Sequence, residues 1–316
     1  MLGARTVKRV IPTTVAEALA NAPELAAQAP LPGSGRTREL WRLLTTIATA
    51  DLGAARAIEP HLDAIAIMHE AGEDSLRTIG TTWGVFAAEG GEPLRFANGV
   101  LNGTKQWCSL ADRLEAALVT ATLENGERQL FAVDLRHAGV DVIEGAWHSR
   151  GLSEVPSGPV TFAAVPATPV GDPGWYLSRP GFAWGGIGVA ACWYGGAIGI
   201  ARTVYASAAN DFALAHLGAI DELLASCRLA LDDAAALVDA GKANSITAKR
   251  VRGTVARAAE EIIARAGHAL GPAPLALDDT HAKRVADLGI YVRQHHAEKD
   301  QASLGRALVA LKVAPW

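Results

Sequence analysis

Apolar residues recur every three or four positions in the first quarter of the chain. The pattern is clearest within residues 36–79, where one helical face would collect Leu40, Leu43, Leu44, Ile47 and Ala48. This spacing is typical of an amphipathic α-helix. Asp51 is suited to cap a second helix, which Pro60 should interrupt or restart because proline lacks the backbone N–H. Residues 1–35, rich in proline and alanine, are expected to form a loosely ordered lead-in.

The pattern then changes to short β-rich runs separated by turn residues. These runs are residues 81–87, 101–107, 115–123, 129–135, 139–145 and 158–165. The pair Asn125-Gly126 between two of them is a strong hairpin signal. The runs predict an antiparallel sheet domain of about ninety residues, of sandwich or barrel type.

From about residue 183 the pattern is helical again. A seven-residue repeat with apolar first and fourth positions includes Leu217, Ile220, Leu224, Cys227, Leu231, Ala234 and Val238. It predicts a helix packed in a bundle and ended by Gly241. A second helix should run from 245 to 270, stopped by Gly271-Pro272, and a third from about 278–280 to about 309.

The order of these elements predicts an α+β fold that is mostly α. We expect N-terminal helices over residues 1–80, a middle antiparallel β domain over 81–172 and a C-terminal helical bundle over 173–316.

Residues 182–201 contain no charged side chain, and their length alone permits a transmembrane helix. It is the only such stretch, it contains several glycines, and both flanks are basic, with Arg179 and Arg202. We therefore favour a helix buried in a large or oligomeric core and expect no membrane span. Together with the seven-residue repeat, this segment offers more apolar surface than one small bundle covers, which predicts a homodimer or homotetramer.

Composition excludes several classes of protein. The chain has 316 residues, a net charge of −4 and 50% apolar residues, which indicates a globular protein and no nucleic-acid binder. Cys108, Cys192 and Cys227 form no Cys-x-x-Cys pair. This favours reduced thiols in a cytoplasmic protein and argues against a disulfide framework or a zinc site. The N-terminus lacks a continuous apolar segment, so we expect no signal peptide.

The most informative segment is residues 102–109, Asn-Gly-Thr-Lys-Gln-Trp-Cys-Ser. Asn102 and Gly103 tolerate the positive φ of a tight turn. A strand that follows would place Trp107 and Ser109 on one face, because side chains alternate with period two. A plain hairpin with a buried tryptophan is the simpler interpretation.

This segment resembles the flavin-contacting segment of the acyl-CoA dehydrogenase family, Asn-Gly-x-Lys-x-Trp-x-(Thr/Ser). A second match is the strand segment 151–162, and a third is the end of an alanine-rich helix at 238–241. The resemblance covers roughly residues 40–310. It implies FAD bound between the sheet and the bundle, with the Trp107 ring on the isoalloxazine, the Ser109 hydroxyl at its N5 edge and Cys108 between them.

The chain departs from the family in its other cofactor segments. Where the family has Thr-Glu-Pro, this chain has Ala88 and Glu89 near the first two positions, so backbone contacts to a flavin could survive and hydroxyl contacts could not. The Arg-x-x-Phe-Gly segment that helps bind the pyrophosphate is missing, since no arginine lies between Arg202 and Arg228.

The family's catalytic glutamate is also replaced. Counting from Asp287 places His295 where that base would lie, and Tyr291, His295 and Glu298 would share one face of a continuous helix. An imidazole near a carboxylate is a competent base at neutral pH. His296 is a second candidate, and a solvated charged helix end is the alternative. Asp221 and Glu222 are weaker candidates, and adjacent histidines are a poor metal-chelating pair.

Three functions remain open. The first is a flavin-dependent oxidoreductase that moves a hydride from a small-molecule substrate, such as an acyl thioester, to flavin N5 while a base removes a proton. The second is a flavin oxidase or monooxygenase on the same fold. The third is a scaffold or assembly subunit that has lost its cofactor.

Overall fold

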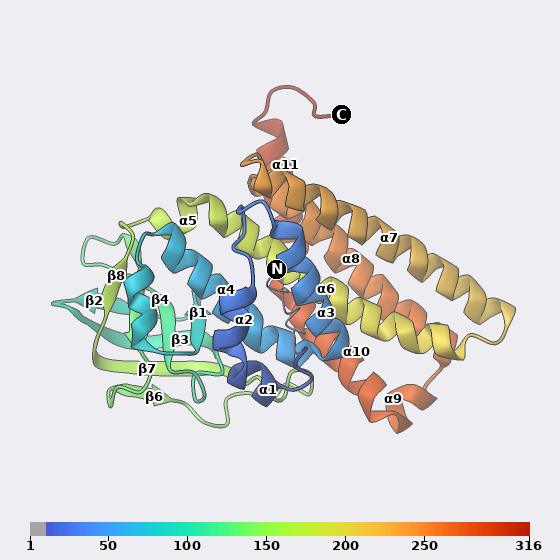
Figure 1. Ribbon diagram of the computed structural model, residues 1–316, viewed down its shortest axis with the longest axis horizontal. Helices are drawn as coiled ribbons and strands as arrows, with labels where there is room; N and C mark the ends of the chain where they lie inside the picture. Colours follow the sequence, from blue (N-terminus) through green and yellow to red (C-terminus); the bar gives the residue numbers. More distant parts are fainter. Residues whose placement is uncertain (1–10) are drawn as a thin grey trace, which may run out of the picture.

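The computed structural model describes residues 11–316, in which a sheet packs against a set of long helices (Figure 1). Four helices precede the sheet: α1 (Val15–Ala20), α2 (Ala22–Gln28), α3 (Thr37–Ala50) and α4 (Leu52–Glu70). The loose lead-in expected for residues 1–35 is therefore wrong over 15–28, and residues 1–10 lie outside the described part. The Thr14 hydroxyl caps α1 by accepting the Glu17 N–H at 3.1 Å, and Val15 and Leu25 are buried.

The cap at Asp51 is confirmed, since its carboxylate accepts the Ala54 N–H at 2.7 Å. The break expected at Pro60 is wrong, because α4 continues through it to Glu70. A proline inside a helix costs on the order of 3 kcal/mol. Burial of Ile58, Leu62 and most of the other α4 residues offsets that cost.

The sheet has the strand order β6-β7-β3-β2-β4-β5-β8, with β1 paired to β4. Its strands are β1 (Trp83–Phe86), β2 (Arg95–Ala97), β3 (Val100–Ser109), β4 (Ala116–Thr122), β5 (Arg128–Asp134), β6 (Val140–Val142), β7 (Ser157–Pro166) and β8 (Thr168–Val170). All six predicted runs are strands, and the short β2 and β8 were not predicted. The expectation of a purely antiparallel sheet is wrong, because β1 pairs with β4 in parallel. Between β1 and β4 in the chain, β3 runs antiparallel to β2, so β4 again runs in the direction of β1 and β2.

One of the two predicted Asn-Gly turns is confirmed. Asn125-Gly126 joins β4 to β5, and Gly126 has a φ of +84°. Asn102 and Gly103 instead lie inside β3, where the Asn102 side chain accepts the Ala164 N–H of β7 at 2.9 Å. The turn into β3 is at Asn98–Gly99, where both residues have positive φ.

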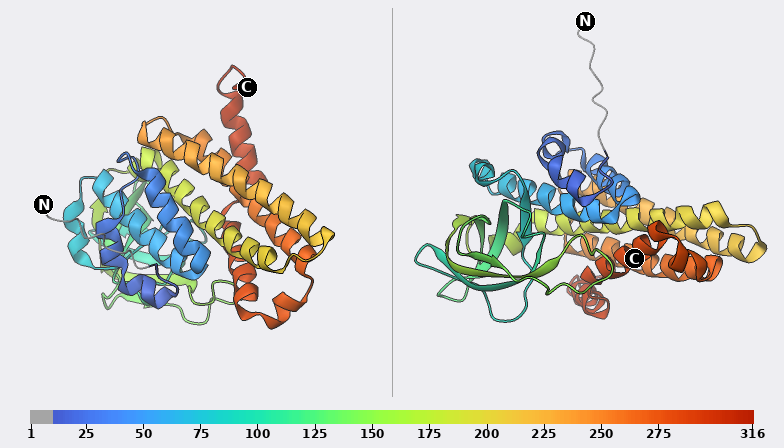
Figure 2. Two further views of the ribbon diagram at one scale, coloured as in Figure 1. Left: turned by 45° about the vertical axis from the view of Figure 1, so that its right-hand side comes forward. Right: turned by 90° about the horizontal axis from the view of Figure 1, so that it is seen from below.

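The helices after the sheet are α5 (Trp175–Ser178), α6 (Pro180–Ser207), α7 (Asp211–Asp239), α8 (Ser245–Leu270), α9 (Ala273–Leu277), α10 (Asp279–Tyr291) and α11 (Glu298–Val309). Short 3₁₀ turns lie at Asp74–Ile79 and Val292–Gln294. The predicted helix over 245–270 is confirmed, and so is the helix that carries the seven-residue repeat, α7. Most positions of the repeat are buried, and Leu217 and Leu224 are half-buried. The prediction of one continuous third helix is wrong. Helix α10 ends at Tyr291, a turn follows, and α11 projects from the body of the molecule (Figures 1 and 2).

Helix α6 forms the centre of the helical part and packs against α3, α4, α7, α8 and α10. Of the helices described, it alone is long and apolar enough to cross a membrane, and 72% of its most apolar window is buried in the protein. Its glycines permit this close packing. A Cβ added at Gly195 would lie 2.4 Å from the Thr45 carbonyl oxygen of α3.

Substituting Gly195 therefore tests the packing of α6. Gly195→Ala should lower the free energy of unfolding by about 1–3 kcal/mol, because the clash is with backbone that cannot rotate away. Gly218→Ala on α7 is the matched control, since no atom lies within 4 Å of its added Cβ, and it should stabilise by up to about 1 kcal/mol through helix propensity. Urea unfolding followed by circular dichroism measures both. Equal stability of the two variants would contradict this packing.

Candidate functional site

Trp107 lies on a β-bulge near the end of β3. The register between β3 and β7 shifts between Lys105 and Cys108, and Trp107 has a φ of +63°. The extra residue interrupts the alternation of side chains. Trp107 is consequently 58% exposed, whereas Ser109 is buried. The expectation that the two side chains share one face is wrong, and so is the simpler interpretation of a buried tryptophan.

The loop after β1 runs beside this bulge. A Cβ at Gly90 would lie 3.6 Å from the Gln106 side chain and 3.8 Å from Trp107 Nε1. Ala88 and Glu89, which precede it, are exposed. The structure therefore brings Ala88, Glu89 and Trp107 to one surface, with their backbone groups and an indole available to a ligand.

Glu89 also reaches the buried end of Lys105. Its carboxylate lies 3.5 Å from Lys105 Nζ and 3.6 Å from an Arg128 nitrogen. Lys105 donates a 2.8 Å hydrogen bond to the Thr120 hydroxyl. Burial lowers the pKa of Lys105, and the neighbouring Glu89 opposes that shift. This group fixes the loop after β1 to the sheet.

Cys108 and Ser109 both point into the protein. The Cys108 thiol donates to the Lys105 carbonyl at 3.4 Å, and burial raises its pKa to about 12, so it stays protonated. The Ser109 hydroxyl lies 2.7 Å from the Ser157 hydroxyl and accepts a 2.8 Å hydrogen bond from Arg56 of α4. A small cleft beside it is lined by Arg56, Pro60, Trp83–Phe86 and Ser109.

His295 lies in the turn between α10 and α11, so it shares no helical face with Tyr291 and Glu298. Its side chain is only 8% exposed, and Nδ1 accepts the Ala297 N–H at 3.2 Å. Burial lowers the pKa of His295, which keeps the ring neutral at pH 7. His296 is 62% exposed and lies 3.6 Å from Asp300. Glu298 is exposed at the start of α11.

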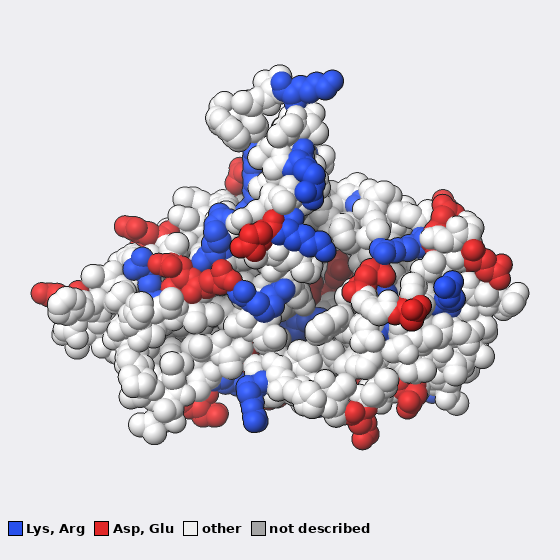
Figure 3. All heavy atoms as spheres, turned by 180° about the vertical axis from the view of Figure 1, so that it is seen from behind, with Lys and Arg blue, Asp and Glu red and all other residues white. Residues whose placement is uncertain are grey.

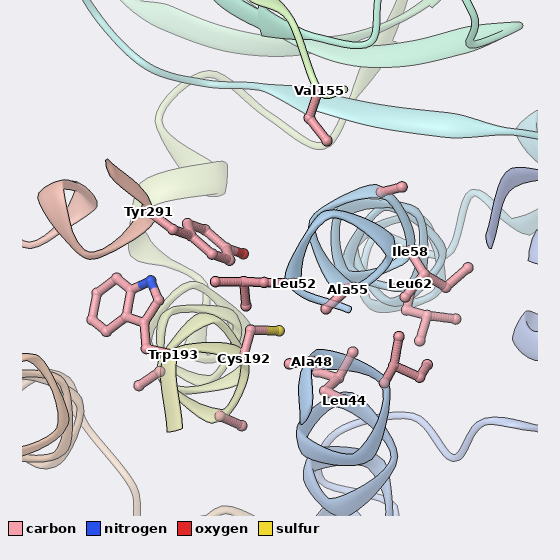
Figure 4. Close-up of a cluster of buried hydrophobic side chains, with 14 of the residues drawn as sticks. Leu44, Ala48, Leu52, Ala55, Ile58, Leu62, Val155, Cys192, Trp193 and Tyr291 are labelled. Carbon is pink, nitrogen blue, oxygen red and sulfur yellow. The ribbon is translucent and has the colours of Figure 1, made fainter. Parts of the chain in front are cut away.

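Tyr291 points into the interior instead of towards His295. Figure 4 shows its hydroxyl directed at the side of α4 that carries Leu52, close to Cys192 of α6. The Arg56 guanidinium lies 5.7 Å from the Tyr291 ring centroid. Arg56 therefore links α10 to Ser109 on the sheet.

Arg252 of α8 makes the corresponding link on the other side. It donates to the Gly186 carbonyl at 2.7 Å and to the Gln294 carbonyl at 3.1 Å, and it lies 4.7 Å from the Trp193 ring centroid. Arg252 thereby holds the turn that carries His295 against α6.

Sequence reasoning missed the charged residues of α4. Arg56, Glu59 and Asp63 stand at helical spacing in a mostly apolar segment, and that signal was available. Burial and the neighbouring Asp63 raise the pKa of Glu59 to about 8, against the opposite effect of Arg56 and Arg252. Asp221 and Glu222 are exposed on α7. Within residues 11–316, no group of three His, Cys, Asp or Glu side chains is arranged to hold a metal ion.

No protein-family model and no curated protein matches the chain, but solved structures do. TdsC from Paenibacillus sp. A11-2, solved with FMN and indole, is 16% identical and has a TM-score of 0.73 over 92% of this chain and 94% of that one. PigA, solved with FAD and proline, is 16% identical, with a TM-score of 0.78 over 96% and 91%.

Butyryl-CoA dehydrogenase from Megasphaera elsdenii is 14% identical, with a TM-score of 0.77 over 93% of this chain and 88% of that chain. The agreement extends over the N-terminal helices, the sheet and the bundle. The protein therefore has the fold of the acyl-CoA dehydrogenases.

Proposed function

We propose that the protein is a flavin-dependent oxidoreductase. The observation that carries this proposal is the exposed indole of Trp107, placed by a bulge beside the loop after β1, on a fold whose solved members include proteins with FMN and with FAD. An indole face stacks well on a planar ring. A flavin bound here would accept a hydride from a substrate C–H.

The residues at this surface fit parts of a flavin. Trp107 would stack on the ring system, and the exposed backbone of Ala88 and Glu89 would supply hydrogen-bonding groups. Cys108 can contribute only backbone atoms because its thiol points inward. The Ser109 hydroxyl already binds Arg56 and Ser157, so it would reach the flavin only by exchanging a partner.

FAD is the cofactor that the resemblance implies, and FMN is the alternative. The absence of arginine between Arg202 and Arg228 removes a charged contact that would favour the larger cofactor. Extraction of the bound flavin and chromatography against FAD and FMN standards distinguishes them.

His295 is our candidate base, with His296 and Glu298 as nearby alternatives. The low pKa of His295 leaves its lone pair unprotonated, and the turn that carries it is fixed by Arg252. For proton removal, Nδ1 would have to exchange the Ala297 N–H for the substrate proton. A neutral imidazole in place of a carboxylate favours the oxidase or monooxygenase alternative over acyl-thioester oxidation.

We further propose that the protein is cytoplasmic. We also propose that it has three domains, at residues 1–80, 81–172 and 173–316. Its three cysteines are free and buried, as expected of a reducing compartment. Fractionation of the source cells would test the location, and limited proteolysis would test the boundaries.

Trp107→Ala tests the flavin wall. The parent should purify with an absorbance band near 450 nm, and the variant should lose most of it because the stacking surface is gone. Trp316→Ala is the control, since Trp316 is 89% exposed at the far end of the chain. A parent that takes up neither FMN nor FAD would support the cofactor-less scaffold, and a Trp107 variant with full flavin content would refute the stacking.

Assembly is tested through the exposed apolar side chains of α6 and α7. Tyr205, Phe212 and Leu229 are 76%, 83% and 61% exposed, and an interface between copies of the chain would cover them. Light scattering should give two or four times the 32.9 kDa chain mass. Phe212→Glu with Leu229→Glu should lower that mass, whereas Glu124→Gln on the β4–β5 turn should not. A parent of single-chain mass at micromolar concentration would exclude the homodimer and homotetramer.

His295→Ala tests the base. Anaerobic mixing with candidate substrates would first identify a compound that bleaches the flavin band. On that compound the variant should be slower by ~10²–10⁴-fold at unchanged flavin content. Because the free imidazole is the active form, the parent rate should rise with pH through an ionisation below 6.5 and then level off. His296→Ala is the exposed control. If both variants keep the parental rate, the base lies elsewhere.

A further inference from the structure

Helix α4 carries a charged face into the interior of the molecule. Arg56, Glu59 and Asp63 follow one another at helical spacing towards α6. A Cβ at Gly185 would lie 2.8 Å from the Asp63 carboxylate, and one at Gly186 would lie 3.4 Å from Arg252. The glycines at the start of α6 therefore leave room for these charged side chains.

The two carboxylates of this face lack partners. Glu59 is only 8% exposed and Asp63 is half-buried. Neither makes a side-chain hydrogen bond or an ion pair within 4 Å with any residue from 11 to 316. A buried carboxylate without a partner costs several kcal/mol of desolvation. The raised pKa of Glu59 reflects that cost.

The neighbouring arginines are engaged elsewhere. Arg56 donates to the Ser109 hydroxyl, and Arg252 donates to two backbone carbonyls. Arg179, the third arginine near this face, pairs with Glu70 at 2.6 Å. Within residues 11–316, therefore, no arginine or lysine forms an ion pair with Glu59 or Asp63.

A second observation points to a ligand in the same region. The Trp193 indole N–H is buried and has no hydrogen-bond partner among the described residues, and the buried Tyr291 hydroxyl has only the Cys192 thiol, a weak partner, beside it. The Tyr291 hydroxyl points towards α4 (Figure 4). Burial raises the pKa of Tyr291, and the nearby Cys192 and Glu59 raise it further. Native interiors leave few polar groups unpaired. Two unpaired carboxylates, an unpaired indole N–H and a weakly paired hydroxyl together indicate a place for a polar molecule.

This region lies between the two halves of the proposed site. Arg56 connects it to Ser109, two residues after Trp107, and Arg252 connects it to Gln294, the residue before His295. On the face drawn in Figure 3, the surface is hollowed below the projecting C-terminal segment, and acidic and basic side chains lie around that hollow.

We infer that the α4 face of Glu59 and Asp63 binds the amine group of a small polar substrate, in place of the alkyl chain of an acyl thioester. This inference rests on the proposed function, since it names the substrate class of the same site. With a pKa of about 8, Glu59 is mostly protonated at pH 7 when no cation is near. An ammonium group would favour its ionised form and would donate hydrogen bonds to both carboxylates. The alkyl chain of a bound acyl thioester would offer neither carboxylate a partner, and it would displace the water that reaches them.

The test compares amines with their N-acetylated forms on the protein as purified. The panel contains glucosamine, proline, lysine and butylamine, each paired with its acetylated derivative, together with butyryl-CoA. Binding is measured by the melting temperature of the protein and by calorimetry, neither of which needs turnover. At least one amine should bind about tenfold or more tightly than its acetylated partner, because a charge-assisted hydrogen bond is lost on acetylation.

Glu59→Gln and Asp63→Asn should each reduce that preference about tenfold at unchanged flavin content. Glu70→Gln, at the Arg179 pair, is the matched control and should preserve the preference. The inference is overturned if no amine in the panel is preferred over its acetylated partner. It is also overturned if the preference survives both carboxylate variants, or if butyryl-CoA binds more tightly than every amine. A protein that binds amines selectively but takes up no flavin refutes the proposed function alone.

Discussion

The close packing of α6 is the constraint on which the rest of the structure depends. This helix contacts α3, α4, α5, α7, α8 and α10, and backbone atoms of α3 approach it to distances that only glycine permits. Helices α3, α4, α8 and α10 are positioned relative to one another through α6. The side chains that meet in the interior, from Arg56 on α4 to Tyr291 on α10, are therefore brought together by a helix that itself carries little chemistry.

The same helix accommodates charged side chains in the interior. Glycines give room on one stretch for Thr45 and Ala48 of α3, and on another for Asp63 and Arg252. Burying charged groups without ion pairs is costly, and a core built for stability alone would replace them with apolar side chains. We infer that a ligand completes the pairing of Glu59 and Asp63.

The bulge on β3 has a comparable role in the sheet. A regular strand would have placed Trp107 on the same face as Ser109. The one additional residue of the bulge turns the Trp107 indole towards solvent, while Cys108 and Ser109 stay buried. Such a local irregularity separates the side chain that meets a ligand from those that hold the strand in place.

The sequence by itself determined the order of helices and strands, the caps at Asp51 and Gly241, the extent of α8 and the resemblance that led to the fold, because these depend on local periodicity and on residues adjacent in the chain. It also put forward Trp107 and His295 as candidate site residues, and those roles stay predictions. Only the tertiary structure decided that β1 pairs in parallel with β4, that α4 continues through Pro60 and that the last helix breaks after Tyr291. It alone turned Trp107 outward and brought Glu59, Trp193 and Tyr291 together, because those outcomes depend on contacts between segments far apart in the chain.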